Sequence, residues 1–164
     1  MNLFPKYPNK YFVETGTCTG GGVLKAIESG FKNIRSIELS DSLYEYSKAL
    51  FKDNPNVILY KGDSTLILWD VIKDITEPIT FFLDGHASGG ITTHNFKFEV
   101  ELKHELRQIA QHPIKTHTIL IDDYNGYQLE GLQDIILKIN PDYKFSFDTY
   151  ADLYPGDVLV AQIK

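Results

Sequence analysis

The stretch of sequence that decides the fold is Tyr11-Phe-Val-Glu-Thr-Gly-Thr-Cys-Thr-Gly-Gly-Gly22. A short apolar run, which predicts a strand, passes directly into a glycine-rich turn, and a helical pattern with Val23, Leu24 and Ile27 on one side follows. Glycines at this point let the backbone approach a ligand closely, and a helix that begins there offers unpaired N–H groups. The stretch therefore predicts a ligand-binding strand, turn and helix.

The spacing of the glycines differs from that of two well-known phosphate-binding loops. Gly16 and Gly20 do not follow the G-x-G-x-x-G pattern of dinucleotide enzymes, and the Gly-Lys-Ser/Thr of a P-loop is absent from the stretch. About twenty residues further on, Glu38 ends the second predicted strand, where an acid can hydrogen-bond both ribose hydroxyls of a nucleoside. Gly62-Asp63-Ser64 follows the third predicted strand, so it belongs to the same edge of the sheet.

Along most of the chain, short apolar runs that predict strands alternate with longer stretches of helical period. This alternation predicts a parallel sheet with right-handed crossovers and helices on both faces. Around Pro155-Gly156 the pattern changes to alternating apolar and polar residues, which predicts two antiparallel strands. We therefore expect one α/β domain over residues 1–164, doubly wound and Rossmann-like, with a mostly parallel sheet and a C-terminal antiparallel hairpin. The strands are expected at residues 11–13, 34–37, 57–60, 79–83 and 117–121, and within 143–147 and 158–162.

The composition narrows the class of partner. The chain of 164 residues has a formal net charge of -6 and scattered Lys and Arg, which disfavours nucleic acid. Cys18 is the only cysteine, so an internal disulfide or a cysteine-rich metal site is excluded. Neither a secretory leader nor an apolar run long enough to cross a membrane is visible. We expect a cytoplasmic domain with no nucleic-acid or membrane partner, and self-association into a homo-oligomer stays open.

An acid directly before the glycine turn, Glu14, suits a ligand that carries an ammonium group, and together with Glu38 it points to S-adenosylmethionine (SAM). The sequence resembles the class I SAM-dependent methyltransferases over nearly its whole length. The resemblance rests on Glu14-Thr-Gly16, Ser36-Ile-Glu38 and Gly62-Asp63-Ser64, while Cys18 departs from the middle glycine of many members. The resemblance implies that the methionine part is held by Glu14, Gly16, Thr17 and Gly20, the ribose by Glu38, and the adenine side by Asp63 and Ser64.

A second group of polar residues follows the fourth and fifth predicted strands. Asp84 and His86 come after the fourth strand, and Asp122-Asp123 comes after the fifth. Neighbouring strands lie roughly 4.8 Å apart, and their carboxyl ends open into the ligand crevice of such a sheet. Three carboxylates that converge there raise one another's pKa unless a cation neutralises them, and oxygen ligands suit Mg²⁺.

This arrangement is similar to that of the metal-dependent O-methyltransferases, especially those that act on sugars. The resemblance implies that Asp84, Asp122 and Asp123 hold Mg²⁺, that Asp84 takes part in catalysis, and that His86 is the general base. The acceptor would be a hydroxyl of a small molecule or a sugar, which the cation would activate.

Other interpretations remain open at this point. Paired aspartates at a strand end also cap turns, and Glu99, Glu101 and Glu105 are expected on the solvated face of a helix. One rival function is a non-catalytic SAM-binding module that acts as a sensor or a partner subunit. Another is a nucleotide-sugar or NAD-binding enzyme, although it needs a different phosphate loop.

Overall fold

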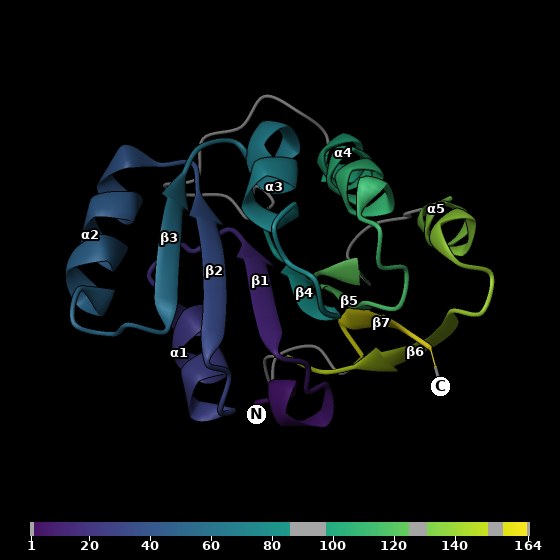
Figure 1. Ribbon diagram of the computed structural model, residues 1–164, viewed down its shortest axis with the longest axis horizontal. Helices are drawn as coiled ribbons and strands as arrows, with labels where there is room; N and C mark the ends of the chain where they lie inside the picture. The colour runs from purple at the N-terminus through teal and green to yellow at the C-terminus, as the bar shows by residue number, and fades with distance from the viewer. Residues whose placement is uncertain (1, 86–97, 125–130, 151–155, 164) are drawn as a thin grey trace.

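Strands β1 to β5 form the parallel part of one seven-stranded sheet with the order β3-β2-β1-β4-β5-β7-β6 (Figure 1). The computed structural model describes residues 2–85, 98–124, 131–150 and 156–163. β7 pairs antiparallel with both β5 and β6, so the hairpin ends the sheet. The strands are β1 (Tyr11–Thr15), β2 (Asn33–Glu38), β3 (Val57–Lys61), β4 (Ile79–Leu83), β5 (Thr118–Ile121), β6 (Lys144–Asp148) and β7 (Val158–Gln162). The predicted doubly wound α/β fold with its C-terminal hairpin is confirmed.

Two helical layers cover the sheet (Figure 1). On one face, α3 (Ser64–Ile72), α4 (Phe98–Gln111) and α5 (Leu132–Ile139) bury a large cluster with Leu68, Leu106 and Ile136. On the other face lie η1 (Phe4–Lys6), α1 (Gly21–Glu28) and α2 (Asp41–Phe51), whose smaller cluster is rich in phenylalanine. Every residue of β4 is buried, as expected for a central parallel strand that is covered on both faces.

The order of the strands decides where a ligand can bind. From β1 the chain moves outward to β2 and β3, and then it crosses back to place β4 on the other side of β1. α1 follows β1 on one face of the sheet and α4 follows β4 on the other, so the carboxyl ends of β1 and β4 lie where open α/β sheets form their ligand crevice. Within the described ranges, no helix is both long and apolar enough to span a bilayer.

Two buried histidines join the far end of the sheet to the loop after α4. The Ile79 N–H donates to His117 Nδ1 at 3.1 Å, so the proton of His117 is on Nε2, 3.1 Å from His112 Nδ1. His112 Nε2 in turn donates to the carbonyl oxygen of Ile75 at 3.0 Å. Burial, aided by His112, lowers the pKa of His117 to about 3. Both rings are thus buried packing groups that are hydrogen-bonded to the backbone.

We expect the stabilisation from neutral His117 to be lost in acid. The unfolded chain binds a proton on this imidazole near pH 6.5, but the folded chain does so only near pH 3, so the unfolded state binds more protons between these values. The free energy of unfolding of the wild type should therefore fall, relative to His117→Asn, by up to about 1.4 kcal/mol per pH unit below pH 6.5. Urea denaturation of both proteins at pH 7.5, 5.5 and 4.5 measures this. A difference between them that stays constant with pH would contradict the assignment.

Candidate functional site

The turn after β1 is pressed against the end of β4. Gly16 has φ +83°, and a β-carbon on it would lie 2.5 Å from the carbonyl oxygen of Asp84, which leaves room only for glycine. The N–H groups of Gly16 and Thr17 both donate to the Ile37 carbonyl oxygen, at 2.9 and 3.1 Å. Gly20 has φ +86° and lies against the ring of Phe51. The turn is therefore anchored to both strands that flank β1.

Glu38 lies beneath this turn at the end of β2. Its Oε2 accepts a hydrogen bond from the Cys18 N–H at 2.8 Å, and its Oε1 accepts one from the Ser40 N–H at 2.7 Å. The carboxylate thus joins the glycine turn to the residue that caps the start of α2. The contact of Glu38 with a ribose stays a prediction. Such a contact would use the second lone pair of each carboxylate oxygen, because the first accepts a backbone N–H.

Glu14, in β1, is almost completely buried. Ser36 Oγ donates to Glu14 Oε2 at 2.6 Å, and the Thr17 hydroxyl lies 2.7 Å from Ser36 Oγ. Burial raises the pKa of Glu14 to about 8, although the bond from Ser36 opposes the rise and the charge of Glu38 adds to it. A β-carbon on Gly22 would lie 1.7 Å from Glu14 Oε1, so the first turn of α1 can approach this acid only because residue 22 is glycine. A cationic ligand group is what a carboxyl in this position favours.

The residues predicted for the adenine side have partners inside the protein. Asp63 caps α3, because its Oδ1 accepts bonds from the Thr65 N–H at 2.8 Å and the Thr65 hydroxyl at 2.6 Å. Ser64 Oγ donates to Glu105 Oε1 at 2.6 Å. Both residues lie at the carboxyl edge, next to the end of β3, as the sequence predicted. Their contact with adenine stays a prediction.

The expectation that Glu101 and Glu105 lie on a solvated face of α4 is wrong, because both are buried. Burial raises the pKa of Glu105 to about 7; the bond from Ser64 opposes this, and the charges of Glu101 and Asp63 add to it. Helix α4 lies between α3 and α5, so it buries a wider arc than the apolar stripe indicates. The position of the Glu99 side chain lies outside the described part of the chain.

Asp84 and Asp122 lie at the ends of adjacent strands. Leu83 pairs with Ile121 across β4 and β5, and the Asp122 N–H donates to the Leu83 carbonyl oxygen at 3.2 Å. Burial and the charge of Asp122 raise the pKa of Asp84 well above its usual value. Burial raises the pKa of Asp122 to about 7, and its Oδ1 is buried with no hydrogen-bond partner among the described residues. The two acids thus follow neighbouring strands, as expected, and their role stays a prediction.

Asp123, the third predicted metal ligand, is exposed, and its backbone has φ +55°. Across the described ranges, no set of three His, Cys, Asp or Glu side chains is grouped closely enough to hold a metal ion. The predicted Asp84, Asp122 and Asp123 triad is thus not assembled here, since the chain turns sharply after Asp122. His86, the predicted base, lies outside the described residues.

Two residues at this edge gave no signal in the sequence. Tyr150 follows β6, and its hydroxyl lies 3.6 Å from where a β-carbon on Gly22 would be. The ammonium of Lys25, on α1, lies 3.6 Å from the centroid of the Tyr150 ring. From the sequence pattern alone, a tyrosine after a hairpin strand and a lysine in a helix are expected to be surface residues without a special role. Only the packing of the hairpin against α1 brings them to the site.

No protein-family model matches the sequence, and no curated protein does either. Solved structures match over almost the whole chain. The O-methyltransferase from Bacillus cereus in complex with SAH has a TM-score of 0.70 at 12% identity, covering 99% of this chain and 77% of that one. The O-methyltransferase TomG from Streptomyces achromogenes, in complex with SAM, has a TM-score of 0.67 at 13% identity, with 99% and 76% covered. An rRNA methylase from Streptococcus thermophilus has a TM-score of 0.59 at 10% identity, with 98% and 92% covered.

The chain therefore has the Rossmann-like fold of SAM-dependent methyltransferases, as the resemblance in the sequence implied. The matched proteins include O-methyltransferases and an rRNA methylase, so the fold is shared by enzymes with different acceptors. An acceptor has to be argued from the site itself.

We expect Gly16→Ala to destabilise the protein more than Gly30→Ala. The two glycines have similar φ values, +83° and +90°, but a β-carbon on Gly30 would meet nothing within 4 Å. Both changes cost about 1–2 kcal/mol for the left-handed backbone, and Gly16→Ala should add roughly 1–3 kcal/mol for the overlap with Asp84. Urea denaturation of the two variants measures this, and equal losses of stability would show that the turn can move away from β4.

Proposed function

We propose that the chain is a SAM-dependent methyltransferase that transfers a methyl group to a hydroxyl of a small molecule or a sugar, with help from a divalent cation. The observation that carries the proposal is a pair of acids at adjacent strand ends beside the glycine turn, half-buried Asp84 and buried Asp122. Binding of SAM alone does not need a second pair of acids at this edge. A methyl acceptor does, because its hydroxyl has to be held and has to lose a proton.

The cofactor side of the proposal rests on charge and position. SAM carries an ammonium and a sulfonium group, and Glu14 is a buried carboxyl at the glycine turn. A cationic neighbour would lower its raised pKa and so stabilise the carboxylate form. Glu38 lies at the end of β2, where an acid can receive ribose hydroxyls. Gly16, Thr17 and Gly20 shape the turn for the methionine part. Asp63 and Ser64 would border the adenine.

The acceptor side fits a cation in part. Asp84, which is half-buried, and Asp122, which is buried, follow adjacent strands, and Mg²⁺ can bind to one or two carboxylates while other oxygens complete its shell. Asp123 is exposed and would have to move to take part. A divalent ion at the pair would lower the pKa of the acceptor hydroxyl. Without a cation, Asp122 Oδ1, which has no hydrogen-bond partner in the described part of the chain, would accept a hydrogen bond from an acceptor hydroxyl.

The reaction is a displacement at the SAM methyl carbon. A lone pair of the acceptor oxygen forms the new C–O bond, while the electron pair of the C–S bond passes to sulfur and leaves a neutral thioether. The hydroxyl proton goes to a base, for which we propose His86, two positions beyond Asp84. The chain contributes chiefly by holding the two reactants in line and by excluding water.

We expect Glu38→Ala and Asp122→Asn to separate cofactor binding from turnover. Glu38→Ala removes a charged acceptor from the ribose and releases the glycine turn, so SAM should bind roughly tenfold or more weakly. Asp122→Asn should keep SAM affinity within about twofold and abolish methyl transfer. Calorimetric titration with SAM and a turnover assay measure the two effects, with Asp53→Ala, an exposed acid, as control. An equal loss of SAM binding in both variants would contradict the division of roles.

We expect Mg²⁺ to change either SAM binding or turnover of the wild type, and chelator to reverse the change. The Asp122→Asn variant should lose this response, because it removes a charged oxygen ligand. Parallel titrations with Mg²⁺ and with chelator, followed by a screen of hydroxyl acceptors, measure it. SAM binding that is indifferent to Mg²⁺, with no turnover of any acceptor, would favour the non-catalytic SAM-binding module instead.

A further inference from the structure

Tyr150 comes from the segment after β6, and yet its hydroxyl reaches the first turn of α1. It lies 3.6 Å from the position of a β-carbon on Gly22, and Glu14 Oε1 lies 1.7 Å from the same position. Burial and the charges of Glu14, Asp84 and Asp122 raise the pKa of Tyr150, so its hydroxyl stays protonated and can donate a hydrogen bond. A phenol donor thus lies at the methionine end of the proposed SAM site.

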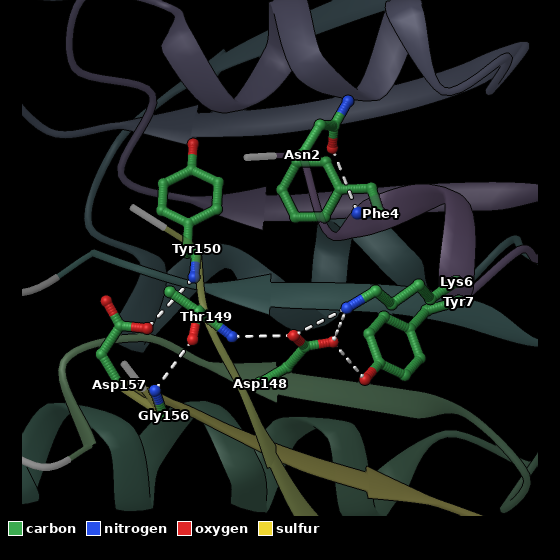
Figure 2. A network of polar contacts seen from close by, with 9 residues as sticks. All are labelled: Asn2, Phe4, Lys6, Tyr7, Asp148, Thr149, Tyr150, Gly156 and Asp157. Atoms are coloured by element: carbon green, nitrogen blue, oxygen red, sulfur yellow. Dashed lines mark hydrogen bonds and ion pairs between the residues drawn. The ribbon is translucent and has the colours of Figure 1, made fainter. Parts of the chain in front are cut away.

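Several contacts hold the ring in this place. Its centroid lies 4.7 Å from that of Phe82 and 5.6 Å from that of Phe4. The Tyr150 N–H donates to Asp157 Oδ1 at 3.1 Å. Figure 2 shows the ring pointing away from this bond and from the neighbouring Asp148, so the backbone is tied down on one side while the hydroxyl extends on the other.

The N-terminal segment forms hydrogen bonds and an ion pair with Asp148, two residues before Tyr150. Lys6 Nζ lies 2.9 Å from Asp148 Oδ1, and the Tyr7 hydroxyl donates to Asp148 Oδ2 at 2.8 Å (Figure 2). The Thr149 N–H donates to Asp148 Oδ1 at 2.8 Å. These bonds connect the beginning of the chain to Asp148 and Thr149, the two residues directly before Tyr150. The aromatic ring is thereby held between segments from both ends of the sequence.

Lys25 adds a positive charge at this point. Its ammonium lies 3.6 Å from the Tyr150 ring centroid, a cation–π contact that holds the long side chain over the ring. Its charge also opposes the rise of the Asp122 pKa. An O–H donor and an ammonium together suit a carboxylate.

Given the proposed function, we propose that Tyr150 and Lys25 bind the carboxylate of the amino-acid end of SAM, while Glu14 binds its ammonium group. The two halves of a zwitterion then meet opposite charges on α1 and β1. Tyr150 is thus a cofactor-binding residue that the hairpin contributes to a site otherwise made by the parallel strands.

The test compares two ligands that differ in the amino-acid end. S-adenosylhomocysteine carries the carboxylate and the ammonium, and 5′-methylthioadenosine lacks both. We expect the wild type to prefer S-adenosylhomocysteine in calorimetric titration. Tyr150→Phe should weaken S-adenosylhomocysteine roughly tenfold and leave 5′-methylthioadenosine within about twofold, because only the former loses a hydrogen bond to a charged group. Lys25→Met, which keeps an apolar stem over the ring, should act in the same direction.

Tyr46→Phe is the matched control, because Tyr46 lies exposed on α2, and it should change neither affinity. Equal weakening of both ligands by Tyr150→Phe, or no change in either, overturns the inference, since a merely structural ring would not distinguish them. If the wild type binds both ligands equally, the carboxylate subsite is absent while the nucleoside site stands. If the wild type binds neither, the proposed function falls, and the inference falls with it.

Discussion

The backbone of Gly16 packs against the end of β4 so closely that a β-carbon would lie 2.5 Å from the Asp84 carbonyl oxygen. This contact holds the turn after β1 at the point where the strand order reverses. The same turn is tied to β2 through bonds from Gly16 and Thr17 to the Ile37 carbonyl oxygen. Glu14 and Glu38 lie near the carboxyl ends of β1 and β2, and Asp84 directly follows β4, so the spacing of these acids depends on this one close approach.

That spacing concentrates negative charge in a place with little water. Burial is the largest cause of the raised pKa of Glu14, Asp84 and Asp122, and the charges of neighbouring carboxylates add to the rise at each of them. A protein normally avoids such a group of acids unless protons or a cation compensate it. The cationic sulfonium and ammonium groups of SAM, and a divalent ion at Asp84 and Asp122, are the compensating charges that the proposed function supplies.

Patterns in the sequence were reliable where one interaction decides the outcome. The run Ile79–Leu83 is apolar throughout because β4 is covered on both faces, and it was predicted as a strand with the same bounds. The patterns failed at α4, where Glu101 and Glu105 occupy positions that look solvated. Their burial comes from packing between α3 and α5, and the bond from Ser64 to Glu105 joins segments far apart in the sequence.

The sequence by itself determined the doubly wound fold and the positions of Glu14, Glu38, Asp84 and Asp122 at its carboxyl edge, because strand period and chain order dictate which strand ends share an edge. Only the tertiary structure decided that Asp123 turns outward, that Glu105 is buried, and that Tyr150 lies beside Gly22. Those outcomes depend on how loops and helices pack in three dimensions. No local period or spacing encodes such packing.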